Sequence, residues 1–171
     1  MRHATAVIDI FTFKEGLLAG VGHDMRLRLD RAEIELEGET IRARVPLAGL
    51  VVEGAVRDGV VQPAALDARQ RADIERAARQ DVLRVARHPT AEFTGTAKPA
   101  QGGFDVRGTL ALAGRSAPLA CRIDGAGPGY QARFTLRPST WGIAPYRALL
   151  GALRLQDRVD LALTVTETPP A

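Results

Sequence analysis

The chain has 171 residues, a length typical of one domain that can bury a hydrophobic core without a metal or a disulfide. Its 23 basic and 20 acidic residues are interleaved and only 5% of its residues are aromatic, a combination that argues against a nucleic-acid-binding surface. The single cysteine, Cys121, excludes an intrachain disulfide. We expect a single domain over residues 1–171.

The N-terminal residues give the first expectation in chain order. Asp9 interrupts the apolar run of residues 1–10, which is too short for the core of a signal peptide. No apolar run of about 18 residues, the length of a membrane span, occurs anywhere in the sequence. The sequence therefore predicts a cytoplasmic location and no integral membrane segment.

Alternation of apolar and polar residues is the dominant pattern, and it predicts half-buried β-strands. Alternating segments, joined by short connections rich in glycine and proline, occupy residues 25–30, 33–37, 41–47, 91–96, 104–112, 117–124, 133–137 and 159–165. About eight or nine such strands indicate a mainly β fold, either a closed antiparallel barrel or a two-sheet sandwich. We favour the barrel because a closed sheet leaves no exposed edges.

One segment departs from this alternation and predicts a short helical insert around residues 64–87. Apolar residues recur there at helical spacing, on a face formed by Leu66, Ile74, Ala77, Ala78, Val82 and Val85. Asp81 is the expected N-cap of a second short helix over residues 82–86. Pro89 disfavours the helical conformation at His88 and ends the insert.

Local motifs do not indicate a catalytic or metal site. The segment Gly114-Arg115-Ser116-Ala117-Pro118 lacks the last glycine of a nucleophile elbow, and Gly16–Gly22 lacks the lysine and hydroxyl of a phosphate-binding loop. His23 and His88 form no closely spaced ligand pair with each other or with Cys121. We therefore expect no catalytic residues, no metal and no cofactor.

Four motifs in the second half of the chain resemble the YceI family, and they occur in that family's order. The first combines residues 81–83 with His88-Pro89-Thr90-Ala91-Glu92-Phe93, and the second is the V-x-G-x-L-x-x-x-G pattern of residues 106–114. Residues 137–143, RPSTWGI, and residues 157–161, DRVDL, are similar to the family's last two motifs.

This resemblance implies an extended lipocalin-like antiparallel barrel that encloses an elongated apolar pocket. It also implies a bacterial protein that binds a polyisoprenoid or other amphiphilic lipid without a metal, and that associates as a homodimer. The expected ligand-binding residues lie on the apolar sides of their strands or just beyond a strand, and they are Phe93, Val106, Leu110, Leu112, Phe134, Leu136, Trp141, Ile143, Leu161 and Leu163. Arg137 and Tyr146 are candidate contacts for a polar head group.

Three functions remain open at this point. The first is non-enzymatic binding, transport or sequestration of a long-chain apolar ligand in the barrel. The second is an enzyme that modifies such a lipid through His23, Asp24 and His88, which requires these side chains to converge. The third is a structural barrel with a filled core, because alternation alone does not distinguish a cavity from a packed interior.

Overall fold

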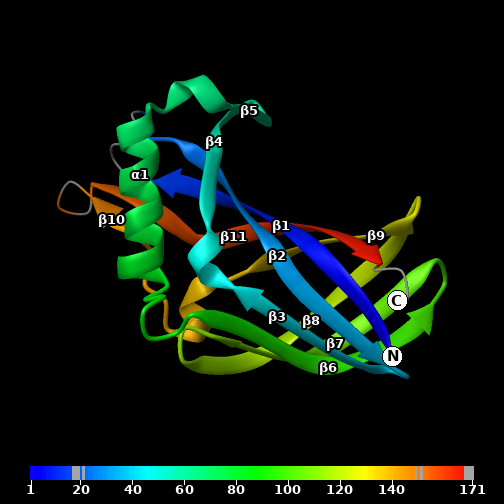
Figure 1. Ribbon diagram of the computed structural model, residues 1–171. Helices are drawn as coiled ribbons and strands as arrows, with labels where there is room; N and C mark the ends of the chain where they lie inside the picture. Colours follow the sequence, from blue (N-terminus) through cyan, green and yellow to red (C-terminus); the bar gives the residue numbers. More distant parts are fainter. Residues whose placement is uncertain (17–19, 21, 149, 151, 168–171) are drawn as a thin grey trace.

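A computed structural model describes residues 1–16, 20, 22–148, 150 and 152–167, and it shows a closed antiparallel β-barrel (Figure 1). The sheet runs in the order β1-β11-β9-β8-β7-β6-β3-β2 and closes where β1 pairs with β2. The mainly β barrel predicted from the sequence is confirmed. Its strands are β1 (Arg2–Glu15), β2 (Asp24–Glu37), β3 (Thr40–Pro46), β6 (Thr90–Ala100), β7 (Gly103–Leu112), β8 (Arg115–Ala126), β9 (Gly129–Leu136) and β11 (Leu153–Glu167).

Strand β2 carries a β-bulge that explains a change of phase in the sequence. Ala6 pairs with Ala32 whereas Ile8 pairs with Leu29, so β2 holds one residue more than β1 between these pairs. The extra residue moves the apolar side chains from odd positions, up to Leu29, to even positions from Ala32 onward. Both halves of β2 therefore turn their apolar residues towards the interior, and two segments that look separate in the sequence form one strand.

Three short strands extend the barrel at one of its ends. Strands β4 (Val51–Arg57) and β5 (Val60–Gln62) form a hairpin in which β4 pairs with the first half of β2. The second half of β2 pairs with β3 instead, so β3 and β4 share one edge of the same strand. Strand β10 (Arg147–Ala148) pairs only with β11 and lies outside the closed ring.

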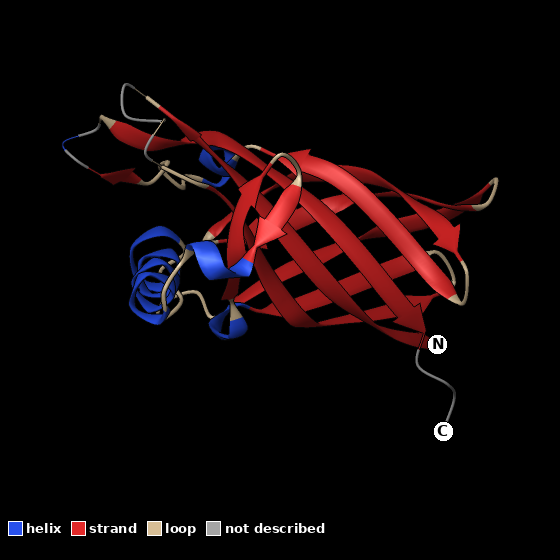
Figure 2. Cartoon of the chain, turned by 90° about the horizontal axis from the view of Figure 1, so that it is seen from above, coloured by secondary structure: helices blue, strands red, loops and turns tan. Residues whose placement is uncertain are grey.

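The helical insert covers the same end of the barrel, which we call the helical end (Figures 1 and 2). It consists of η2 (Pro63–Ala65), α1 (Ala68–Ala77) and η3 (Ala78–Val82). Two further short turns, η1 (Leu47–Gly49) and η4 (Pro138–Trp141), follow barrel strands. The opposite end, which we call the turn end, holds the hairpin connections β2–β3, β6–β7 and β8–β9.

The prediction of a second short helix over residues 82–86, with Asp81 as its N-cap, is wrong. Asp67 caps α1 instead, because its carboxylate accepts a hydrogen bond from the backbone N–H of Gln70 at 2.8 Å while the Gln70 side chain accepts one from the backbone N–H of Asp67 at 2.9 Å. This reciprocal pair satisfies two amides that have no partner within the helix. Asp81 lies within η3, which continues α1 without a break and ends at Val82.

Two charged side chains hold α1 against β4. Arg71 donates through Nη1 to the carbonyl oxygens of Val52 and Glu53, at 2.9 and 3.1 Å. Glu75 accepts a hydrogen bond from the backbone N–H of Val52 at 2.9 Å. The backbone of β4 thus both accepts hydrogen bonds from side chains of α1 and donates one to them. These hydrogen bonds fix α1 over the helical end.

Charged residues on the outer surface connect β4 to the barrel. Arg28 donates through Nε to Asp9 of β1 at 2.8 Å and lies 3.5 Å from a carboxylate oxygen of Glu53 on β4. Arg26 bridges the same two carboxylates at 3.5 and 3.6 Å. The hydrogen bond that Arg28 donates to Asp9 raises the pKa of Arg28 above its ordinary value. This network lies across three neighbouring strands, where each charge has an opposite charge within contact distance.

Candidate functional site

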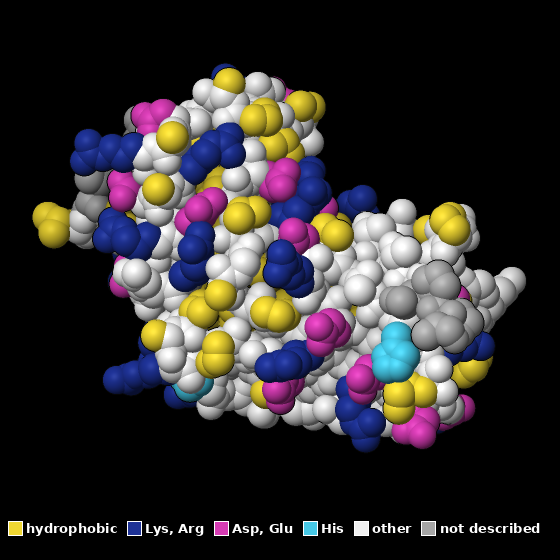
Figure 3. All heavy atoms as spheres, in the orientation of Figure 1, with side chains coloured by type: hydrophobic (Ala, Val, Ile, Leu, Met, Phe, Trp, Pro, Cys, Tyr) yellow, Lys and Arg dark blue, Asp and Glu magenta, His cyan; other side chains and the backbone are white. Residues whose placement is uncertain are grey.

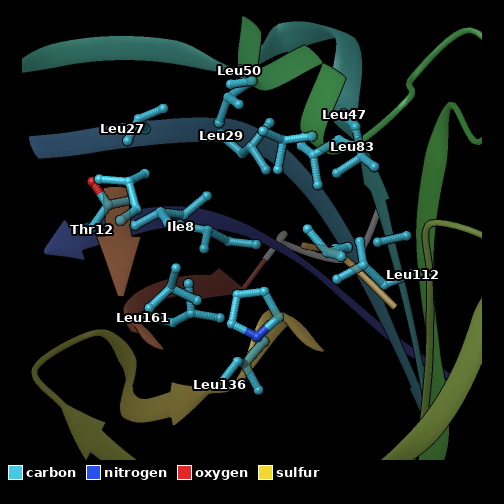
Figure 4. Close-up of a pocket in the computed structure, with 18 of the residues that line it drawn as sticks. Ile8, Thr12, Leu27, Leu29, Leu47, Leu50, Leu83, Leu112, Leu136 and Leu161 are labelled. Carbon is cyan, nitrogen blue, oxygen red and sulfur yellow. The ribbon is translucent and has the colours of Figure 1, made fainter. Parts of the chain in front are cut away.

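The barrel encloses a cavity of about 860 Å³, lined by side chains from all eight strands of the closed ring and from α1 (Figure 4). Its volume lies near the upper end of the range of about 300–1,000 Å³ that is typical of small-molecule sites. The lining residues of β11 run from Arg154 to Leu163, a stretch that spans roughly 30 Å at about 3.3 Å per residue, so the cavity is elongated along the strand. The interior is therefore hollow, which contradicts the structural barrel with a filled core.

All ten wall residues predicted from the sequence line this cavity. Leu112, Leu136 and Leu161 are among those labelled in Figure 4, together with Ile8, Leu27 and Leu29 from the first two strands. Their common position follows from the alternation, which places every second side chain of a barrel strand inside. Contact with a ligand stays a prediction for each of the ten.

Phe93 occupies a part of the wall where two neighbouring strands lack side chains. Gly95 of β6 pairs with Gly108 of β7, and a β-carbon built on Gly108 would lie only 2.7 Å from Cζ of Phe93. The ring thus lies over the glycine of the next strand, and Phe93 is only 8% exposed. Glycine at position 108 leaves the space in which this ring forms an apolar surface.

Trp141 closes part of the wall at the helical end. It follows the end of β9 in η4, where Gly142 ends the turn with a φ of 71°, a conformation that favours glycine. The indole N–H donates to the carbonyl oxygen of Leu110 at 2.8 Å, and Trp141 is 3% exposed. This hydrogen bond satisfies the polar atom of the ring, so Trp141 presents an apolar surface to the cavity.

Among the described residues, polar side chains line the cavity only near the helical end. They come from the last residues of β1, the residue before β2, the helices, and the β10–β11 region, and they are Thr12, Lys14, His23, Gln70, Asp73, Arg76, Asp81, Tyr146, Arg154, Gln156 and Arg158. Towards the turn end the wall is built from residues such as Ile34, Ile41, Phe93 and Ile123. The cavity is thus apolar along most of its length and polar at one end.

Several of the charged groups at this end have partners within the protein. Lys14 donates through Nζ to the carbonyl oxygen of Gly22 at 3.0 Å, and Arg154 lies 2.7 Å from a carboxylate oxygen of Glu15. Arg158 contacts Asp160 at 2.7 Å and lies 4.7 Å from the centre of the Phe13 ring. These contacts orient the cations at the rim of the cavity.

The two candidate head-group residues lie in different places. Tyr146 lines the cavity and is 42% exposed, so it lies where the interior meets solvent. Arg137 is exposed and does not line the cavity, because it directly follows the inward-facing Leu136 and so points to the outer face. There it lies near Asp157, whose pKa is lowered mainly by hydrogen bonds from Ser139 and to a smaller extent by the charge of Arg137.

The residues of the enzyme alternative do not converge. His23 lines the cavity, whereas Asp24 accepts a hydrogen bond from the backbone N–H of Lys14 at 2.9 Å and His88 lies outside the lining. The His88 ring packs on the β7–β8 turn, since a β-carbon built on Gly114 would lie 2.6 Å from its Cε1. Among the described residues, no three histidine, cysteine or acidic side chains form a group that could hold a metal ion.

Cys121 is a cavity residue, on the inner face of β8. Burial raises the pKa of its thiol, because a thiolate loses hydration in an apolar interior. A reactive cysteine requires a lowered pKa, whereas the pKa of Cys121 is raised, so Cys121 has the environment of a wall residue and not of a nucleophile.

The sequence patterns missed the wall residues that β1 supplies. Ala6, Ile8 and Ile10 face the cavity, but Phe11 and Phe13 on the opposite face are also apolar, so the segment lacks a clear alternation. Pairing with strands on both sides, β11 and β2, identifies it as a barrel strand. Of the glycine-rich segment Gly16–Gly22 that follows, residues 17–19 and 21 lie outside the described residues.

No helix in the described part of the chain is long and apolar enough to cross a bilayer. The family model described as "YceI-like domain" matches residues 11–166. No curated protein matches the sequence.

Solved structures resemble the fold at low sequence identity. A polyisoprenoid binding domain from Saccharophagus degradans has a TM-score of 0.66 at 11% identity, with 98% of each chain covered. BcnA from Burkholderia cenocepacia has a TM-score of 0.61 at 11% identity, with 96% of each chain covered. The Campylobacter jejuni YceI protein has a TM-score of 0.55 at 11% identity, over 84% of this chain and 85% of that one. These similarities show a shared fold.

Proposed function

Because the chain belongs to the YceI-like domain family, we propose that it binds a single long-chain amphiphile, of the polyisoprenoid class, inside its barrel. The observation that carries this proposal is a cavity of about 860 Å³ whose wall is apolar except at the helical end. The name of one structural neighbour, a polyisoprenoid binding domain, supports this ligand class. The protein would act by carrying or sequestering the lipid and not by changing it.

The distribution of polar residues gives the ligand an orientation. Burial of each methylene group stabilises the bound lipid by about 0.8 kcal/mol. The binding free energy of the tail is therefore most favourable where the wall is continuously apolar, towards the turn end. A polar head group needs hydrogen-bond partners when it leaves water, and Gln156 and Tyr146 line the helical end. The head group therefore lies beneath α1 and β10, with the tail extended along the barrel.

Lipid extraction and native mass spectrometry of the freshly purified protein test the proposal directly. We expect one bound lipid per chain, and binding of added farnesyl to octaprenyl compounds after delipidation. An interior that holds no lipid and binds none of these compounds would overturn it. Parallel incubation with the candidate lipids, followed by mass analysis of the products, tests non-enzymatic binding, because an enzyme would change their mass.

We also propose that the protein is cytoplasmic and forms a homodimer, as the sequence and the family resemblance predict. Cell fractionation followed by immunodetection tests the location. Light scattering during gel filtration tests the dimer, because it measures mass independently of shape.

A further inference from the structure

Resting on the proposed function, we infer that the hairpin formed by β10 and the start of β11 docks on an anionic lipid bilayer, from which the amphiphile enters the cavity. A long-chain lipid exchanges poorly through water, because each methylene group that leaves an apolar phase lowers the partition constant about fourfold. A binding protein therefore gains access to such a ligand most readily where its cavity opening contacts the membrane.

The hairpin lies at the cavity opening. Ala144, Pro145, Tyr146 and Ala148 line the cavity on the way into it, and Leu155 and Gln156 line the cavity on the way out. The backbone N–H of Leu155 donates to the carbonyl oxygen of Tyr146 at 3.0 Å, which holds the two arms together. Strand β10 lies outside the closed ring, and it projects with the start of β11 beyond the barrel at the helical end (Figure 1).

Apolar side chains on the hairpin face solvent. Leu150 is fully exposed and Tyr146 is 42% exposed, so both are among the most exposed large hydrophobic residues of the described chain. Tyrosine is enriched at membrane interfaces because its ring is apolar and its hydroxyl remains hydrated. An exposed leucine gains free energy when it enters the acyl boundary of a bilayer.

The charges of the hairpin fit an anionic surface. Residues 144–156 contain two arginines and no aspartate or glutamate. Arg147 is exposed and has no acidic partner among the described residues, whereas Arg154 is paired with Glu15. In Figure 3, basic side chains in dark blue and hydrophobic ones in yellow share the surface around α1 with some acidic ones. Within the hairpin itself, every formally charged side chain is basic. Each basic residue that lies near an anionic membrane strengthens the binding of the protein to that membrane.

Vesicle co-sedimentation tests the docking. The wild-type protein should bind vesicles of phosphatidylcholine with 30% phosphatidylglycerol, and bind pure phosphatidylcholine vesicles less. Leu150→Asp and Arg147→Glu should each weaken binding to the anionic vesicles at least tenfold. The matched controls Val60→Asp, an exposed aliphatic residue on β5, and Arg42→Glu, an exposed cation on β3, should change it by less than twofold.

A second measurement separates this inference from the proposed function. Neither Leu150 nor Arg147 lines the cavity, so both variants should bind farnesol from dilute solution with wild-type affinity while taking up a fluorescent polyprenol from vesicles more slowly. Wild-type vesicle binding equal to that of both hairpin variants would overturn the docking, even if farnesol binds. A wild-type protein that binds vesicles but no farnesol would overturn the proposed function instead. If Leu150→Asp loses a dimer that the wild type forms, with vesicle binding unchanged, the hairpin contacts a second copy of the chain, and its docking on the membrane is refuted.

Discussion

The orientation of the bound lipid can be measured at Cys121, the single thiol of the chain, because it lines the cavity near the middle of β8. Cys121 lies six positions after Arg115, which is at the helical end, and six residue steps correspond to about 20 Å along the strand. With a strand tilt of about 40°, the distance along the barrel axis is about 15 Å. An isoprene unit adds four chain bonds, which span about 5 Å by comparison with the three bonds of an extended residue.

A ligand whose head group is held at the helical end therefore needs about three isoprene units to cover Cys121. Saturating geraniol, with two units, should leave the rate of Cys121 alkylation within twofold of the ligand-free rate. Farnesol and longer compounds should slow it at least tenfold. The assay is the rate of mass increase with a small thiol reagent at a fixed pH of about 8, because burial raises the pKa of the thiol and only the thiolate reacts.

The neighbouring residue offers a matched control. Ala120 lies on the exposed outer face of the same strand, so a variant with Cys121→Ser and Ala120→Cys should react at one rate with and without any ligand. Equal protection of Cys121 by geraniol and farnesol, both shown to be bound by calorimetry, would refute a head group fixed at the helical end. Absence of protection by any bound chain would refute a tail that extends past the middle of the barrel.

Three further predictions concern the wall, the helix and the pH dependence of stability. Phe93→Arg should weaken binding of farnesol at least tenfold in a calorimetric titration, because it places a charge in the apolar wall. The control Thr94→Arg, on the exposed face of the same strand, should leave binding unchanged. Equal affinities of the two variants for farnesol would place Phe93 away from the ligand. Asp67→Ala should lower the free energy of urea unfolding by about 1 kcal/mol through loss of the N-cap of α1, and an unchanged value would show that the capping box does not stabilise the fold. Hydrogen bonds from the hydroxyl and the backbone N–H of Ser139 lower the pKa of Asp157, so its carboxylate stabilises the fold above the ordinary carboxyl pKa of about 4, and this contribution is lost as the pH falls through the lowered value. The difference in unfolding free energy between the wild type and Asp157→Asn should therefore shrink from pH 7 to pH 2.5, and a difference that is the same at both pH values would contradict the assignment.

Strands with one apolar face were predicted well because the alternation of apolar and polar residues indicates which of their faces is buried. Val106, Leu110 and Leu112 occupy even positions of β7, and the structure places all three on the cavity wall. Strand β1 was missed because Phe11 and Phe13 add an apolar outer face that hides the period of two. Its place in the barrel depends on pairing with β11, which lies about 150 residues later in the chain.

The polar end of the cavity could not be predicted from local patterns. Lys14, Gln70 and Tyr146 come from three distant segments, and each looks like an ordinary surface residue in the sequence. Only the closure of the barrel, with α1 packed over one end, brings them together. The position of α1 in turn depends on Arg71 and Glu75, whose backbone partners on β4 have no signature in the sequence.

The amino-acid pattern by itself determined the mainly β class of the fold and, in strands with a clear alternation such as β7, which side chains face inward, since both follow from a local period within each such strand. Tertiary structure decided that the interior is hollow. The volume of a barrel depends on the number and stagger of its strands, and these are properties of the closed sheet and not of any one segment. It also decided that the cavity is apolar along its length and polar at one end, because that polarity exists only after segments distant in the sequence have come together.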